Sequence, residues 1–223
     1  MAKAVLLFPQ YLVFWEARLA RFIPSLALFA VFLLAPPVSG TVAAGIVSID
    51  EAKMEMAIGD KDAPVTMVEY SSLGCPHCAA FHKDTLPRIK KEYIDTGKVR
   101  LVYRDFPLGT PALAAAMIAR CAGPKKFFDF IEILFLSQAQ WAKSRTPLDA
   151  LSKVVRRGGM SQADVDACLK YQPLLEFIRQ DALVAQETYK INSTPSFVIG
   201  TEIISGNQPF EEFKKVLDKA LIK

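Results

Sequence analysis

The sequence is poor in metal-binding residues and in net charge. Its 223 residues include two histidines and four cysteines, and its formal net charge is only +4. The C-x-x-C pair of Cys75 and Cys78 is not followed by a second one, so a structural zinc site with four ligands lacks its second ligand pair. A charge this small, with no block of like charges longer than a few residues, also argues against a nucleic-acid partner.

A long apolar run is absent as well. The run at residues 22–35 holds about 14 residues, whereas a membrane-spanning helix needs roughly 20. Arg21 precedes this run and small residues follow it, which predicts a secretory signal peptide over residues 1–44, cleaved after Ala43 or Ala44. An uncleaved membrane anchor is the alternative. Export would place the chain in the periplasm, an oxidising compartment in which disulfides persist.

One stretch organises the rest of the chain. Residues 65–70 predict a buried apolar strand, and residues 78–93 predict a helix that is kinked at Pro87. Cys75 and Cys78 therefore stand where a helix begins. The partial positive charge and the unpaired N–H groups of a helix N-terminus stabilise a thiolate on the first cysteine.

The two residues between the cysteines fit this interpretation. Pro76 falls in the first turn, where its missing N–H costs little, and His77 offers a positive charge or a hydrogen bond. A lower thiol pKa stabilises the reduced form and makes the disulfide more oxidising, which favours a redox pair. Two alternatives stay open, a structural pair and a metal carrier. In a carrier the two thiolates, with His77 or His82, would bind a soft ion such as Cu(I).

A second motif, S-T-P-S-F-V-I-G, covers residues 193–200. Together with E-Y-S-S-L-G-C-P-H-C-A-A-F-H at residues 69–82, it resembles the DsbA-like branch of the thioredoxin superfamily, of the alphaproteobacterial type. The resemblance covers roughly residues 50–223. It implies that the Thr194–Pro195 bond is cis and lies against the redox pair, where it shapes the surface that a substrate strand pairs with. By base rate alone this bond would be trans.

Glu69 is the one acidic residue in an otherwise apolar strand, six residues before Cys75. A carboxylate beside a buried dithiol can accept and return a proton during exchange, and burial raises its pKa. The resemblance implies the same role for this glutamate. The alternative is a solvated side chain at the edge of the sheet.

The two remaining cysteines are Cys121 and Cys168. Four cysteines can pair in three ways, and the close pair of Cys75 and Cys78 leaves these two for a structural disulfide. Such a bridge would close a loop of about 48 residues and contribute roughly 4 kcal/mol in the chain-entropy model. Two buried free thiols are the alternative.

The predicted elements suit an α/β protein, a thioredoxin-like fold with an inserted all-helical domain. Strands are predicted at residues 55–58, 98–106, 197–199 and 201–204, besides the one before the cysteines, and an amphipathic helix at residues 209–222 closes the chain. Helical periodicity runs from about residue 110 to 190 and includes one helix at residues 125–141, whose phenylalanines are predicted to lie in the core, with the alternative that some of them line a groove for unfolded substrate. The order of the strands comes from the resemblance alone. The predicted division is a signal peptide at residues 1–44, a thioredoxin-like domain at 45–109 and 191–223, and the helical domain at 110–190.

The predicted function is that of an exported protein-disulfide oxidoreductase that introduces disulfides into reduced or unfolded exported proteins. It needs no organic cofactor, and the resemblance implies reoxidation by a quinone-linked membrane partner of the DsbB type. A disulfide isomerase or reductase of the same fold is the first alternative. About 20 residues separate the predicted cleavage site from the core, too few for a dimerisation domain, which favours a monomeric oxidase.

Overall fold

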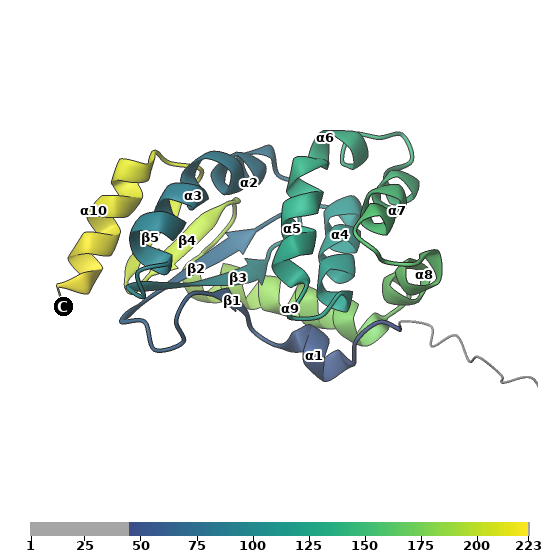
Figure 1. Ribbon diagram of the computed structural model, residues 1–223, viewed down its shortest axis with the longest axis horizontal. Coiled ribbons are helices and arrows are strands. Elements are labelled where there is room, and N and C mark those ends of the chain that lie inside the picture. Colours follow the sequence, from purple (N-terminus) through teal and green to yellow (C-terminus); the bar gives the residue numbers. More distant parts are fainter. Residues whose placement is uncertain (1–44, 223) are drawn as a thin grey trace, which may run out of the picture. The chain divides into compact units, whose positions relative to one another are not determined.

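The chain builds a mixed β-sheet with helices on both faces, as the computed structural model of residues 45–222 shows (Figure 1). Within these residues the sheet has five strands in the order β1-β3-β2-β4-β5. β2 is parallel to β3, and the other neighbours are antiparallel. The strands are β1 (Met56–Ile58), β2 (Val65–Ser71), β3 (Val99–Asp105), β4 (Ser196–Ile199) and β5 (Glu202–Ser205). The predicted signal peptide lies outside the described residues.

The central strand β2 sends alternate side chains to two different cores. Val65 and Met67 pack on one face, under α10 (Phe210–Leu221) and the helical run that follows the cysteines. Tyr70 packs on the opposite face, near Ala185 of α9 (Gln172–Tyr189). Because side chains alternate along a strand, Glu69 shares the face of Val65 and Met67. The carboxylate thereby points toward the helix that carries the redox pair.

That helical run changes its winding twice. It comprises α2 (Pro76–Ala80), the π-helical turn η1 (Phe81–Thr85), α3 (Leu86–Ile89) and a second π-helical turn, η2 (Lys90–Ile94). The sequence predicts a kink at Pro87, and the structure has the wide turn η1 immediately before that residue. Proline lacks an N–H and clashes with the carbonyl four residues earlier, so the preceding turn opens. Thr85 marks the change with φ −99°.

A helical region lies beside the sheet and holds the largest of the hydrophobic cores (Figure 1). The predicted helix at residues 125–141 is divided at Ser137, whose φ of −98° and ψ of 7° leave the helical range. The predicted phenylalanine core is confirmed for Phe127, Phe130 and Phe135, which are buried. The helices are α1 (Ile49–Lys53), α4 (Thr110–Cys121), α5 (Phe127–Leu136), α6 (Gln138–Trp141), α7 (Pro147–Arg157) and α8 (Gln162–Leu169).

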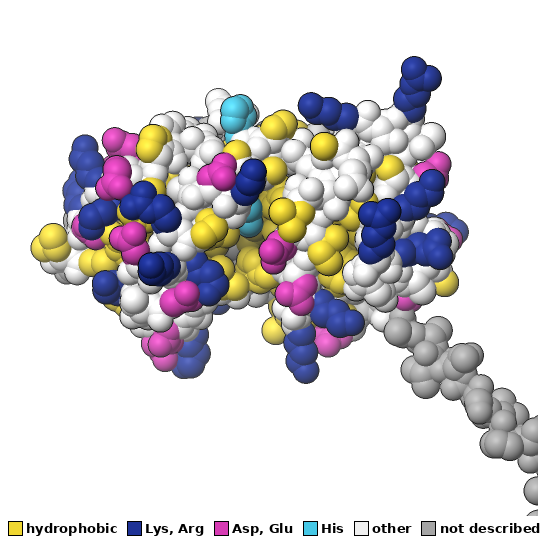
Figure 2. Space-filling model, turned by 45° about the horizontal axis from the view of Figure 1, so that its top comes forward, with side chains coloured by type: hydrophobic (Ala, Val, Ile, Leu, Met, Phe, Trp, Pro, Cys, Tyr) yellow, Lys and Arg dark blue, Asp and Glu magenta, His cyan; other side chains and the backbone are white. Residues whose placement is uncertain are grey.

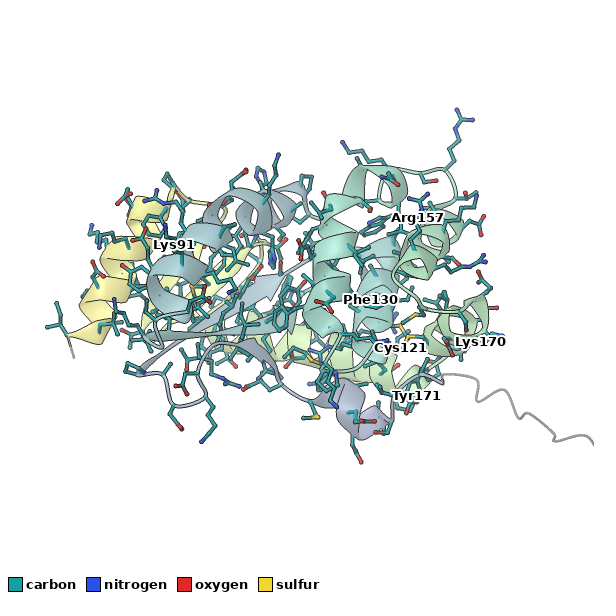
Figure 3. The ribbon with its side chains drawn as sticks, viewed as in Figure 1. Lys91, Cys121, Phe130, Arg157, Lys170 and Tyr171 are labelled. Carbon is teal, nitrogen blue, oxygen red and sulfur yellow. A yellow bond between two sulfur atoms is a disulfide. The ribbon has the colours of Figure 1, made fainter. Side chains whose placement is uncertain are left out.

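Cys121 at the end of α4 and Cys168 in α8 form a disulfide with an S–S distance of 2.05 Å (Figure 3). It ties α8 to α4 within the helical region and takes no part in the redox pair. The predicted boundaries between a thioredoxin-like domain and an inserted domain stay a prediction. Across residues 45–222, the helices are too short or too polar to span a membrane.

Candidate active site

The redox pair lies where the chain passes from β2 into α2. Cys75 is the N-cap of α2, with φ −86° and ψ 122°, and Pro76 is its first helical residue. Both cysteines are free thiols. Cys75 is 8% exposed, whereas Cys78 is fully buried. Cys75 is therefore the sulfur that a second protein can reach.

Hydrogen bonds favour the thiolate form of Cys75. The largest contribution comes from the Cys78 thiol, followed by the side chain of Thr194 and by the main-chain N–H groups of Cys78 and His77. Burial acts in the opposite direction, but the donors prevail and lower the pKa of Cys75 to about 5. A thiol with this pKa is almost fully ionised at neutral pH.

His77 and Pro76 are both exposed. The leading contribution of His77 to the Cys75 thiolate comes from its main-chain N–H, which the first turn of α2 directs at the sulfur. A charge on the exposed imidazole is screened by solvent. That the His77 imidazole lowers the pKa of Cys75 stays a prediction. The structure supports only the contribution of the His77 main-chain N–H.

Cys78 has the opposite tendency. Burial raises its pKa well above the ordinary value, and the hydrogen bond to Cys75 and the negative charge of Glu69 raise it further. The main-chain N–H of Ser72 lies 3.5 Å from the Cys78 sulfur. At neutral pH the reduced pair thus holds one proton, which resides on Cys78.

Glu69 is completely buried, with Tyr103 and Phe197 as its neighbours on the adjoining strands. It is not a solvated side chain at the edge of the sheet. Nε2 of His82 lies 3.0 Å and 3.1 Å from its two carboxylate oxygens. The buried carboxylate therefore has a titratable partner on η1, the turn that follows the redox pair.

The loop before β4 covers the redox pair from the other side. The Thr194–Pro195 bond is cis, and the Cys75 thiol donates to the Thr194 carbonyl over 3.2 Å. The buried hydroxyl of Thr194 makes no hydrogen bond to any other group of residues 45–222 in the thiol state. When Cys75 ionises, this hydroxyl becomes one of its donors. The structure thus brings Thr194 and Pro195 to the redox pair, as the resemblance implies.

Two residues of the site are not among the site residues that the sequence predicts. For His82 the sequence leaves three interpretations open, a residue that tunes the site, a metal ligand and a half-buried core residue, and in the structure it contacts Glu69. Its position four residues after Cys78, on the same helix face, was the available signal. Gln138 of α6 donates from its side-chain amide to the carbonyls of Leu73 and Cys75, over 2.7 Å and 3.0 Å. A separation of more than sixty residues gives no local signal for this contact.

The structure adds no ligand to the metal-carrier alternative. His82 is turned to Glu69, and within residues 45–222 there is no group of three or more histidine, cysteine or carboxylate side chains that could hold an ion.

The chain is similar in sequence and fold to known proteins. A thioredoxin family model matches residues 51–219. A Rickettsia typhi protein named as a protein-disulfide oxidoreductase is 33% identical over 168 residues, which cover 75% of this chain and 62% of that protein. The chain thus spans less than two thirds of the length of this relative.

Two solved structures are similar over most of their length. Wolbachia pipientis α-DsbA1 is 30% identical with a TM-score of 0.69, and the match covers 75% of this chain and 90% of that one. Oxidised BdbD from Bacillus subtilis is 25% identical with a TM-score of 0.66, and the match covers 80% of this chain and 97% of that one. These similarities confirm the thioredoxin-like fold with a helical insertion. The chain belongs to the thioredoxin family, in its DsbA-like branch of the alphaproteobacterial type.

Proposed function

We propose that the chain is an exported protein-disulfide oxidoreductase that introduces disulfide bonds into secreted or periplasmic proteins. The observation that carries this proposal is the opposite shift of two neighbouring thiols. The pKa of Cys75 falls to about 5, while that of buried Cys78 rises. A stabilised thiolate favours the reduced enzyme, so its disulfide is a strong oxidant.

The exchange has two steps. A substrate thiolate attacks the Cys75 sulfur of the enzyme disulfide, forms a mixed disulfide and displaces Cys78 as a thiolate, which takes up a proton. A second substrate thiolate then attacks the substrate sulfur and displaces Cys75, which leaves readily because its pKa is low. The substrate loses two electrons, and the enzyme keeps them as the Cys75 thiolate and the Cys78 thiol.

The other site residues serve these steps. Thr194 supplies a donor to the Cys75 thiolate, and the cis bond to Pro195 shapes the surface at which a substrate strand would lie. Glu69 would exchange a proton with Cys78, and the effect of its charge in raising the pKa of Cys78 supports this role. Pro76 starts the helix, and the first turn aims N–H groups at the sulfur.

Similarity to DsbA-like proteins also supports the proposed setting. The similar BdbD structure is of the oxidised protein, and relatives in Bacillus are named disulfide bond formation proteins. We place the chain outside the cytoplasm, with reduced exported proteins as its substrates and a quinone-linked membrane protein of the DsbB type as its reoxidant. It would act as a monomer.

An isomerase or reductase of the same fold is the competing function, and the reduction potential separates the two. We expect a potential well above that of thioredoxin, about −270 mV, because the Cys75 thiolate is stabilised. A value near that of thioredoxin would favour the reductase.

Two measurements test the proposal on the full chain. The oxidised protein should form disulfides in a reduced, unfolded client faster than air does, whereas Cys75→Ser should be inactive. The thiolate absorbance of Cys75 should titrate well below the free-cysteine pKa of about 8.5. An unshifted titration together with an inert oxidised protein would refute the oxidase. His77→Ala separates the imidazole from the main-chain N–H, since only loss of the imidazole effect would raise the pKa.

A further inference from the structure

Proton access poses a problem at this site. Cys78 must gain a proton when it is displaced and lose one when it attacks, yet it is completely buried. Glu69, the carboxylate whose charge raises the pKa of Cys78, is completely buried as well. Neither group can exchange protons with solvent by itself, so a third group has to connect them to it.

His82 makes that connection. Its Nε2 contacts both oxygens of Glu69, at 3.0 Å and 3.1 Å, and its side chain is 11% exposed. The same residue lines a groove of about 780 Å³ between the helical run and α5. Hydrophobic side chains gather in the hollow of this face, between α3 and α5 (Figure 2). His82 is therefore the member of the buried pair that meets solvent.

The surroundings hold the imidazole in place. It lies in the π-helical turn η1, whose wider winding follows directly on α2. Its ring packs against Phe135 of α5 at 4.5 Å between centroids, and against Phe81 at 5.6 Å. π-helical turns occur frequently at functional sites because they change the direction of single side chains.

Other titratable groups near the imidazole do not offer the same path. Tyr103 of β3 packs edge-on to the ring at 6.1 Å, and burial raises its pKa well above the ordinary value. On β2 the group that faces the imidazole is Glu69, and the charge of Glu69 in turn acts on Cys78 of α2. β1 offers the apolar Ile58 to the groove, and the α5 side chains that line it are apolar except for Glu132. The charged groups that line the groove are Lys83, Asp84, Lys90 and Glu132.

We propose that His82 passes protons between the solvent of this groove and Glu69, and that Glu69 exchanges them with Cys78. This inference rests on the proposed thiol–disulfide exchange and names the route of its proton. When Cys78 attacks the mixed disulfide at Cys75, its proton goes to Glu69, the bond to the partner sulfur breaks, and the partner leaves as a thiolate. Glu69 then passes the proton on to the imidazole of His82, which releases it to water. The reverse sequence protonates Cys78 when it is displaced.

The test isolates the step in which Cys78 attacks. The full chain is prepared with Cys75 in a mixed disulfide with glutathione, and the release of glutathione is followed from about pH 5 to about pH 9. His82→Gln keeps an amide donor toward Glu69 but cannot carry a proton. It should slow release about tenfold or more at neutral pH, the scale of general acid–base catalysis, and recover as hydroxide rises. Glu132→Gln, which removes a titratable group from the same groove, should leave the profile unchanged.

Chemical rescue separates a proton carrier from a structural residue. In His82→Ala the groove opens onto the space left by the ring, so added imidazole should restore most of the rate, whereas imidazolium-free buffer of equal ionic strength should not. Unchanged kinetics in His82→Gln, or slow kinetics in both variants without rescue by imidazole, would overturn the proposal.

A measurement on the unmodified chain tests the proposal without relying on variants that could misfold. The inflection of its pH–rate profile should coincide with the His82 titration measured by NMR in the same mixed disulfide, and a mismatch of more than about one pH unit would refute the relay. The proton route and the oxidase proposal can fail separately in these experiments. If His82 fails these tests while the wild-type chain still oxidises clients, only the proton route is wrong.

Discussion

The Cys75 thiolate couples the stability of the reduced protein to pH. The folded pKa of about 5 lies below that of the unfolded chain, so the thiolate stabilises the fold fully above about pH 9 and loses this effect as pH falls to about 5. Across this window the free energy of unfolding should fall by up to roughly 1.4 kcal/mol per pH unit. Denaturant titrations of the reduced protein at several pH values measure the slope. Cys75→Ser should lack this component, and equal slopes in both proteins would contradict the assigned pKa.

The hydroxyl of Thr194 allows a second test at one atom. Thr194→Val removes a donor to the Cys75 thiolate, so we expect the pKa of Cys75 to rise by roughly one to two units, the value of one hydrogen bond to a charge. The ultraviolet absorbance of the thiolate reports this pKa. Thr194→Ser keeps the hydroxyl and should stay near the wild-type value. If both variants titrate alike, the Cys78 thiol and the main-chain donors stabilise the thiolate without help from the Thr194 hydroxyl.

The residues of the site differ in how well the sequence predicts them. Cys75 and Cys78 stand at a strand–helix junction, which is a local pattern, and the threonine–proline pair belongs to a motif that the resemblance identifies. The contact of His82 with Glu69 has no such pattern, because it depends on which face of β2 meets which turn of the helix. That choice depends on the alternation along the strand together with the wide turn η1, and periodicity alone does not predict π-helical winding.

Among the helices, the short α6 has a direct effect on the active-site loop. The side-chain amide of Gln138 donates to the carbonyls of Leu73 and Cys75. Gln138→Ala leaves both carbonyls without this donor, so we expect a loss of about 1–3 kcal/mol in the free energy of unfolding. Faster amide hydrogen exchange in the loop before α2 should accompany it.

Gln140 provides the matched control, since it lies on the same helix with an exposed side chain. Gln140→Ala should change neither stability nor exchange. If Gln138→Ala behaves like this control, the helical region does not stabilise the loop through α6. A continuous helix at residues 125–141, as the sequence predicts, does not lead one to expect the contact of Gln138 with the loop. The chain direction changes at Ser137, and α6 begins at Gln138.

For the whole molecule, composition and periodicity predicted the elements but not their neighbours. The strands and the closing helix appear near their predicted positions, because alternation and helical spacing are local properties. The parallel pairing of β2 with β3, between two antiparallel edges, depends on contacts between distant segments. Only the resemblance supplied the strand order. The same limit applied to the buried ion pair that joins the sheet to the helices.

That ion pair joins Arg120 of α4 to Asp105 at the end of β3, and both side chains are buried. Arg120 also donates to the carbonyls of Ala52 and Met54, so one guanidinium connects α4, the sheet and the chain around α1. Burial raises the pKa of Asp105 even though the guanidinium acts in the opposite direction. For Asp105, the free energy lost by removing its charge from water therefore exceeds the free energy gained from its attraction to Arg120.

A double-mutant cycle tests this balance. Arg120→Met leaves the buried Asp105 without a partner and should lower the free energy of unfolding by about 3–5 kcal/mol, and Asp105→Leu should be similarly costly because it strands the arginine. The double variant removes both charges, so we expect it to be more stable than either single variant, measured by denaturant unfolding. Purely additive losses would mean that the two charges do not interact. Arg120 would then stabilise the fold through its hydrogen bonds to the carbonyls of Ala52 and Met54, and the connection to α1 would depend on these bonds alone.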